Sequence, residues 1–116
     1  MTLYHVWCNL KPGVLDTDFT DAMDGYLGHL REERMIESWR ITRRQLGLGP
    51  KSLPEFHIMI ELTGLTQFDG MFTAVSSRRE PIESLHHAVN SKAQDVIFAL
   101  YRDFPDPNRH RGEEKF

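Results

Sequence analysis

The chain has 116 residues and a net charge of −3 at pH 7 with histidine neutral, which is the size of one domain that can fold without disulfides or a structural metal. The slight acidity argues against a general electrostatic attraction to nucleic acid or to acidic lipid, so neither partner is expected. The sequence has no apolar stretch long enough to span a bilayer and no signal-peptide pattern, so a cytoplasmic location is expected.

Residues Leu3–Leu10 are predicted to form the first strand, because apolar and other side chains alternate along them. A strand directs successive side chains to opposite faces, so one set is expected to meet a core. That set includes the single cysteine, Cys8, which is expected to be a small buried apolar residue. The other set consists of His5, Trp7 and Asn9, an unusual composition for a face in contact with water.

A helix is predicted to begin at Asp16–Asp18, where carboxylates and a hydroxyl favour a helix N-terminus. Apolar residues then recur at helical spacing from Phe19 to Leu30. Gly25 and Gly28 lie within this segment, and each lowers helix propensity by about 1 kcal/mol relative to alanine. We therefore expect another element to pack closely against this helix.

Two further strands are predicted at Ile36–Leu46 and Phe56–Leu62, separated by the turn-forming residues Gly47–Pro50. Arg40 and Arg44 share one parity of the first of these strands. The alternation in the other strand is as regular as in Leu3–Leu10. Its apolar side is Phe56, Ile58, Ile60 and Leu62, and its second side is His57, Met59 and Glu61.

The second half of the chain predicts an interrupted helical region and a last strand. The spacing of Thr66 and Asp69 resembles a capping box, which would open a helix with Phe68 and Phe72 in the core. Pro81 is expected to restart the helix, and residues 95–104 favour a strand by length and composition. We therefore predict a domain at residues 1–104 and a polar tail at residues 105–116.

This order of elements predicts an α+β, ferredoxin-like βαββαβ fold with an antiparallel four-stranded sheet and both helices on one face. In that arrangement the first and third predicted strands are central, so their unusual second sides share the open face of the sheet. A face of this size that carries tryptophan and methionine predicts a partner. The expected partner is a second copy of the chain, forming a homodimer through the open sheet face.

Two segments carry a resemblance to known proteins. Residues 37–44 (ESWRITRR) and 99–105 (ALYRDFP), together with the order of elements, resemble the dimeric α/β-barrel superfamily. The resemblance includes its stress-responsive barrel proteins and an uncharacterised bacterial family of dimeric ferredoxin-like proteins. It implies that two sheets pack face to face as a homodimer around a barrel interior. Because members include cofactor-free monooxygenases, haem-degrading enzymes and proteins of unknown role, it implies fold more strongly than activity.

The open-face residues are the candidate site. If the first and third strands pair about their midpoints, His5 lies opposite Glu61, Trp7 opposite Met59 and Asn9 opposite His57. A carboxylate beside an imidazole raises its basicity, so His5, His57 and Glu61 are candidate acid–base residues. Candidate ligand-binding residues are Trp7, Asn9, Arg40 and Arg44. The favoured alternative is that these polar groups satisfy one another across the dimer interface, and that the arginines pair with acids such as Glu37 or Glu55.

No cofactor is expected from the sequence, which contains no cofactor-binding motif. His5, His57 and Glu61 could form a two-histidine, one-carboxylate metal site, but no ligand spacing supports this and no metal is predicted. His86 and His87 point about 100° apart on a helix, so one is expected to face inward and the other water. A haem ligand on that helix is implied only by the resemblance.

Two hypotheses for function remain open. The first is a barrel protein that binds a small organic ligand between the sheets, with or without enzyme activity of the oxygenase or isomerase kind. The second is a non-enzymatic, stress-linked dimer whose inner face is filled by side chains. An accessible cavity beside His5 and His57 would favour the first hypothesis, and a fully packed interior the second.

Overall fold

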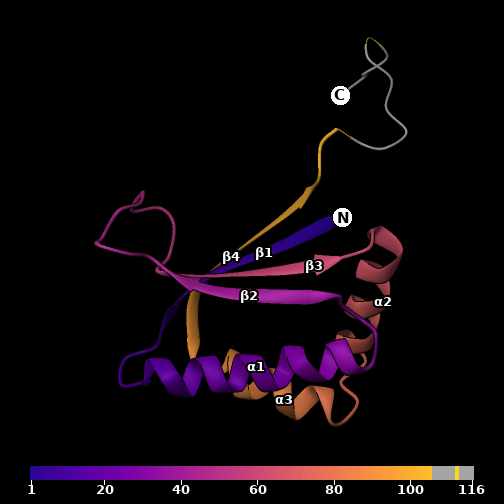
Figure 1. Cartoon of the computed structure of the whole chain (residues 1–116). Helices are drawn as coiled ribbons and strands as arrows, with labels where there is room; N and C mark the ends of the chain where they lie inside the picture. Colours follow the sequence, from indigo (N-terminus) through magenta and orange to yellow (C-terminus); the bar gives the residue numbers. More distant parts are fainter. Residues whose placement is uncertain (106–111, 113–116) are drawn as a thin grey trace.

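The computed structural model describes residues 1–105 and 112 and confirms the α+β, ferredoxin-like architecture (Figure 1). Four strands form one antiparallel sheet in the order β2-β3-β1-β4, so β1 and β3 are central as predicted. The helices lie together against one face of the sheet. In chain order the elements are β1 (Thr2–Leu10), α1 (Asp16–Glu32), β2 (Ser38–Arg43), β3 (Phe56–Leu62), α2 (Leu65–Ser76), α3 (Ile82–Asn90) and β4 (Ala93–Arg102).

The core lies between the sheet and α1. Alternate side chains of β3 are buried while their neighbours are only half-buried, as the alternation in the sequence predicts. Each fully buried aliphatic or aromatic side chain contributes about 1.5–3 kcal/mol through removal of its surface from water. The main contributors are Phe56, Ile58, Ile60 and Leu62 of β3, Cys8 of β1, and Phe19, Met23, Leu27 and Leu30 of α1.

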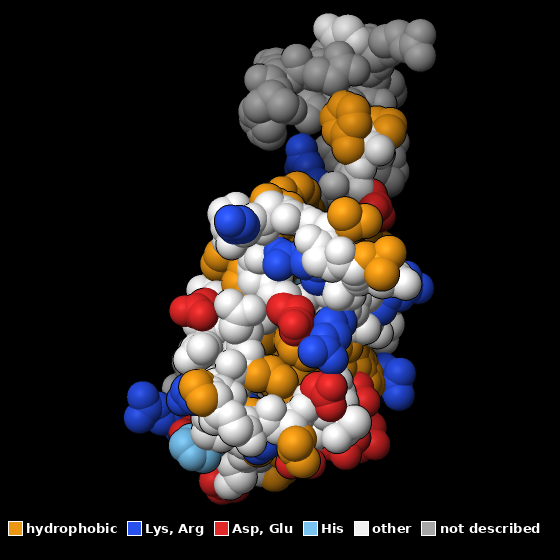
Figure 2. All heavy atoms as spheres, turned by 90° about the vertical axis from the view of Figure 1, so that its left-hand side faces the viewer, with side chains coloured by type: hydrophobic (Ala, Val, Ile, Leu, Met, Phe, Trp, Pro, Cys, Tyr) orange, Lys and Arg blue, Asp and Glu red, His pale blue; other side chains and the backbone are white. Residues whose placement is uncertain are grey.

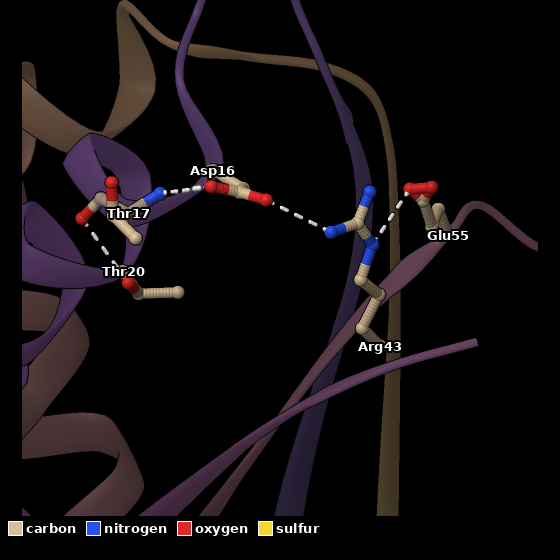
Figure 3. A network of polar contacts seen from close by, with 5 residues as sticks. All are labelled: Asp16, Thr17, Thr20, Arg43 and Glu55. Carbon is tan, nitrogen blue, oxygen red and sulfur yellow. Dashed lines mark hydrogen bonds and ion pairs between the residues drawn. The ribbon is translucent and has the colours of Figure 1, made fainter. Parts of the chain in front are cut away.

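One end of the molecule carries the β2–β3 loop and the start of α1. On this face, basic and acidic side chains are interspersed with apolar ones, and no broad basic surface is formed (Figure 2). Arg43 joins the two elements there by donating to Asp16 Oδ2 at 3.0 Å and to Glu55 Oε2 at 3.2 Å (Figure 3). The hydrogen bond and charge of Glu55, followed by those of Asp16, raise the pKa of Arg43. Glu55 is therefore paired with Arg43, and not with Arg40 or Arg44.

The second strand is shorter than predicted, because β2 spans Ser38–Arg43 rather than Ile36–Leu46. Ile36 is buried ahead of the strand, and Leu46 has a φ of +57°, which is incompatible with extended backbone. The chain thus leaves the sheet after Arg44, whose backbone N–H donates to Glu55 O at 2.8 Å. A long β2–β3 loop results, and it extends on the side of the sheet away from the helices (Figure 1).

The predicted capping box at Thr66–Asp69 is wrong. Helix α2 begins at Leu65, with Gly64 in the N-cap position and no side-chain cap. The nearby polar contact instead comes from Gln67, whose Oε1 accepts a hydrogen bond from the Thr63 N–H at 2.8 Å. This hydrogen bond satisfies a backbone donor just ahead of the helix, and the first N–H groups of the helix itself have no side-chain cap.

The two glycines of α1 have different surroundings. The ring of Trp39 lies 3.7 Å from the position a Cβ would take at Gly28. That indole also donates from Nε1 to Asp24 Oδ1 at 2.9 Å, and the guanidinium of Arg31 lies over its ring. At Gly25 no atom lies within 4 Å of the added Cβ. The expected close packing is therefore present at Gly28 and absent at Gly25.

Strand β4 is an edge strand whose apolar side chains remain exposed on both faces. Within the part of the chain that the structure describes it pairs with β1 alone, and the register shifts between Trp7 and Asn9. Phe98, on the helix side, is 59% exposed, and Tyr101, on the open side, is 60% exposed. Isolated apolar side chains are common on surfaces, but a whole strand of them marks a binding surface.

Candidate functional site

The open face of the sheet carries a row of four aromatic rings. The rings of His5, Trp7 and His57 are nearly parallel, and their centroids form a triangle with sides of 5.5 Å (His5–Trp7), 5.1 Å (His5–His57) and 4.7 Å (Trp7–His57). The ring of Tyr101 on β4 meets His5 edge-on at 5.0 Å. All four residues come from β1, β3 and β4, whose alternation directs them to the same side. The row gives the open face an aromatic centre in which two of the four rings are imidazoles.

The two histidines of this row are hydrogen-bonded to each other. His5 Nδ1 and His57 Nε2 lie 2.8 Å apart, so one nitrogen donates and the other accepts. Burial lowers the pKa of both imidazoles, and for His57 the charge of His5 lowers it further. The pair is therefore held neutral at pH 7, a state in which an imidazole can accept a proton.

The predicted pairing of His5 with Glu61 is wrong. Strands β1 and β3 pair two residues away from the assumed register, so His5 lies opposite Met59 and Trp7 opposite His57. Glu61 lies opposite Leu3 and accepts a hydrogen bond from Ser38 Oγ at 3.1 Å. A shift of two residues keeps every side chain on its predicted face while changing its neighbour. The imidazole of His5 thus has a second imidazole as its partner.

Asn9 and Arg44, two of the remaining candidate residues, lie in different parts of the structure and make different contacts. Asn9 does not lie opposite His57; its amide bridges the Glu55 N–H and the carboxylate of Asp95. Arg44 donates from Nη2 to the carbonyl oxygens of Pro50 and Leu53, so it holds the β2–β3 loop.

Arg40 stays on the open face, opposite Met59, and is exposed. Of the two arginines proposed to bind a ligand, Arg40 is therefore the one placed to meet an anion there.

No metal centre is formed in the part of the chain that the structure describes. Within residues 1–105 and 112, no group of three histidine, cysteine or acidic side chains is arranged to hold an ion. The adjacent histidines of α3 point in different directions, as predicted from helical geometry. His86 is half-buried against the ring of Tyr26, with centroids 5.4 Å apart, whereas His87 is exposed.

A partly open cavity lies on the other side of the sheet, between it and the helices. Its volume is about 280 Å³ and its lining is mostly apolar. Four polar side chains interrupt that lining: Tyr4 from β1, Tyr26 from α1, Ser76 from α2 and His86 from α3. The apolar lining comes from Val6, Met23, Leu27, Leu30, Ile60, Met71, Phe72, Val75, Val89 and Phe98.

The two tyrosines of this cavity are kept protonated. Burial raises the pKa of Tyr4 to about 12. Burial and then the neighbouring Tyr4 raise the pKa of Tyr26. Neither hydroxyl makes a hydrogen bond within the described residues. Both hydroxyls stay accessible to solvent, since no fully buried polar side-chain atom within the described residues lacks a partner. Two phenols that open into an apolar cavity are placed to meet a ligand group or water.

The sequence predicts the candidate site on the open face and does not predict this cavity. Tyr4 and Tyr26 were expected on core-facing stripes, and His86 on an inward helix stripe. The feature of the sequence that could have indicated the cavity is a hydroxyl or imidazole group on an otherwise apolar stripe. Phe72, expected in the core, is 43% exposed at the cavity's edge. A stripe pattern shows the direction of a side chain and not whether neighbours fill the space in front of it.

Comparison with known proteins places the chain in a family. A sequence model described as "Family of unknown function (DUF6614)" matches residues 1–116. The chain belongs to this family. No curated protein matches it, so the family brings no assigned activity. No helix in residues 1–105 is long and apolar enough to cross a membrane.

Solved structures share the fold at low sequence identity. A variant of SnoaB, a cofactor-independent oxygenase from Streptomyces nogalater, has a TM-score of 0.69 at 6% identity, covering 93% of this chain and 97% of that one. A dimeric ferredoxin-like protein of unknown function from Jannaschia sp. CCS1 has a TM-score of 0.64 at 12% identity, covering 89% and 100%. A hydroxynitrile lyase from Passiflora edulis has a TM-score of 0.59 at 13% identity, covering 91% and 97%. The DUF6614 chain thus has a fold that serves unrelated chemistries.

Proposed function

We propose that this protein binds a small, largely apolar organic molecule in the cavity between its sheet and helices, and works as a homodimer joined through the open sheet face. The observation that carries the binding proposal is the pair of unpaired phenols, Tyr4 and Tyr26, in an apolar cavity of about 280 Å³. Ligand sites in proteins are commonly concave and apolar with a few placed polar groups.

The chemistry of the cavity favours a ligand with one hydrogen-bonding group. A neutral phenol donates a hydrogen bond and also accepts one, and the imidazole of His86 beside Tyr26 can do the same. Apolar side chains surround these groups, so the rest of the ligand is expected to be a hydrocarbon ring or chain. A phenol, an alcohol or a ketone of modest size fits that description.

The homodimer proposal depends on the composition and shape of the open face. The ring row of His5, Trp7, His57 and Tyr101 lacks a covering element within the described residues. The β2–β3 loop and the C-terminal end of β4 extend on this side (Figure 1). A second copy would cover the rings, and solved structures with this fold are described as dimeric.

Binding in the cavity is tested by calorimetric titration with phenol and cyclohexanol. We expect Tyr26→Phe to lower phenol affinity about two- to tenfold, the usual effect of one neutral hydrogen bond. Val75→Trp should block binding by filling the cavity, while Leu46→Trp adds the same ring to an exposed loop and should leave binding unchanged. Full phenol affinity in the Val75→Trp variant would contradict the cavity as the site.

The dimer is tested by sedimentation velocity over a range of protein concentrations. Met59→Asp places a charge at the centre of the open face and should yield monomers. Ser84→Asp adds the same charge to the exposed side of α3 and should leave the dimer intact. A wild-type protein that sediments as a monomer at every concentration would defeat this part of the proposal.

A second candidate function is acid–base chemistry on the open face. The 2.8 Å bond between His5 and His57 and their lowered pKa values favour a neutral imidazole that accepts a proton, with Arg40 on the same face to hold an anion. Glu61 lies opposite Leu3 and not beside His5, so in this candidate it does not act on the His5 imidazole. This candidate predicts that His5→Gln and Arg40→Gln weaken binding of benzoate while Tyr26→Phe does not. The opposite pattern would assign binding to the cavity.

A further inference from the structure

The helices cover the central strands of the sheet and leave the edge strand β4 largely uncovered. Ile58, Val6 and Phe98 form a row across β3, β1 and β4, because Val6 pairs with both of the others. All three side chains point to the helix side. Ile58 is fully buried, Val6 is half-buried and Phe98 is 59% exposed. Leu100, the next residue of β4 on this face, is 45% exposed. The exposed fraction thus rises across the sheet towards β4.

The cavity opens at this uncovered edge. Of the side chains that line it, those from α1, α3 and the central strands are buried or half-buried. The exposed ones are Phe72 and Ser76 of α2 and Phe98 of β4. Lining residues that are also exposed lie where a cavity meets the surface, so the mouth of this cavity lies between α2 and β4.

Phe72 and Phe98 form the two lips of this mouth, and both rest on the ring of Tyr4. The ring of Phe98 is parallel to that of Tyr4 with centroids 5.9 Å apart, and Phe72 meets Tyr4 edge-on at 5.7 Å. Tyr4 therefore spans the space between the lips, and its hydroxyl group stays accessible there.

The two lips differ in how firmly they are held. Phe72 also contacts Phe68 of the same helix, with ring centroids 4.7 Å apart. In the part of the chain that the structure describes, Phe98 meets no aromatic ring other than that of Tyr4, and it extends from an edge strand. Because exposed side chains change rotamer on the picosecond to nanosecond timescale, Phe98 is the lip that can move without disturbing the core.

We propose that ligands enter the cavity between α2 and β4, and that Phe98 controls both the rate of entry and the size of the ligand that fits. This inference rests on the proposed function and adds the entry route and a residue that determines specificity. With Phe98 in place, a phenol with one ring is accommodated, whereas a second ring in line with the first meets the lip. Two aromatic side chains from different elements around one opening favour an entrance for a small molecule over a flat docking surface.

The size limit is tested by calorimetric titration of the full chain with phenol and with 4-phenylphenol, which differ by one phenyl ring. Phe98→Ala removes a phenyl ring from the mouth, so it should raise the affinity for 4-phenylphenol relative to phenol about tenfold or more. Phe98→Leu should change this ratio in the same direction and to a smaller extent. Leu100→Ala is the matched control: Leu100 is exposed on the same face of β4 and does not line the cavity, so the ratio should stay unchanged.

The rates of binding distinguish an entrance from a simple wall. Phe98→Ala should speed the association and the dissociation of phenol by a similar factor, and Phe98→Trp should slow both. A residue that only formed part of the wall would change mainly the dissociation rate. NMR line shapes of phenol during the titration, combined with the affinity, give both rates. Phe98 and Leu100 are exposed, so the variants are expected to fold, and circular dichroism checks this.

Different results separate the two proposals. Phenol binding that depends on Tyr26, combined with unchanged rates and an unchanged affinity ratio in Phe98→Ala, would overturn the inference and leave the proposed function standing. Absence of binding by phenol and 4-phenylphenol alike would overturn both. If Phe98→Ala and Leu100→Ala both changed the sedimentation of the protein and left the ligand rates unaltered, a second copy would cover β4, and the inference would be wrong.

Discussion

Adjacent residues of β1 face two regions with opposite properties. Tyr4 faces the cavity under the helices, where burial raises its pKa to about 12 and its hydroxyl lacks a partner within the described residues. His5 faces the open side, where burial lowers its pKa and His57 binds it at 2.8 Å. Both regions are partly withdrawn from water, yet only on the open side do the polar groups pair with each other. The paired imidazoles already satisfy each other, whereas the phenol hydroxyls, which remain accessible to water, are available to a ligand group.

This comparison reverses the initial assignment of roles. The open face, with its histidines and arginine, has the residue types of an active site, but its central pair is already bonded. The helix side has the composition of a core, but it contains a cavity. We therefore propose that the open face serves assembly and the cavity serves binding.

The largest expected effect on stability comes from substitutions at neighbouring residues on the two sides of β3. Ile58→Ala leaves a gap in the fully buried core and should lower the free energy of unfolding by about 2–5 kcal/mol. Met59→Ala, one residue along and half-buried on the open face, should cost less. Urea denaturation at several protein concentrations measures both.

The concentration dependence separates the two sides. The effect of Met59→Ala should grow with protein concentration, because it weakens the dimer, whereas that of Ile58→Ala includes a large part that does not depend on concentration. Equal and concentration-independent losses would show that the open face is not an interface.

The next effect concerns pH and the imidazole pair. Since burial lowers the pKa of His5 and His57 in the folded state, the unfolded chain binds more protons below about pH 6.5. The stability contributed by the neutral pair is thus complete above that pH and is lost as pH falls. The denaturation midpoint should therefore be higher at pH 7.5 than at pH 5.5.

Variants assign that pH dependence to the pair. His57→Gln should reduce the difference between the two pH values, whereas His87→Gln, on the exposed side of α3, should preserve it. An unchanged difference in His57→Gln would place the responsible titration elsewhere in the molecule.

The smallest effect lies on the outer surface of α1, away from both regions. Gly25→Ala should raise the free energy of unfolding by about 0.5–1 kcal/mol, because alanine favours the helix and nothing lies within 4 Å of the new Cβ. Gly13→Ala should instead destabilise, since Gly13 has a φ of +84°. Thermal unfolding by circular dichroism compares the two. A loss of stability in Gly25→Ala would indicate that a partner packs against this helix face.

Much of the fold could be predicted because it depends on local periodicity. Alternation in Leu3–Leu10 and Phe56–Leu62 assigned each side chain to its correct face. The order of elements then placed these strands at the centre of the sheet. The division into a domain at residues 1–104 and a tail stays a prediction, because residues 106–111 and 113–116 lie outside the described part of the chain.

The failures share a physical cause. Alternation has a period of two residues, so pairing that is displaced by two is indistinguishable from the assumed one, and His5 was matched with Glu61 rather than Met59. Helix boundaries depend on backbone hydrogen bonds that side-chain patterns only approximate, which explains the misplaced start of α2. Cys8, by contrast, is buried as composition predicted, and burial raises the pKa of its thiol to about 11.

The face on which each side chain lies follows from the order of residues along the chain, because strand and helix periods are local properties of the backbone. That order also predicts an uncovered sheet face. Which side chains meet across strands depends on register, bulges and loop lengths, which bring distant residues together. The His5–His57 bond, the loop contacts of Arg44 and the cavity beside Tyr4 and Tyr26 all belong to this second class. A cavity in particular is space that neighbouring elements leave unfilled, and its volume emerges only when helices and sheet are packed.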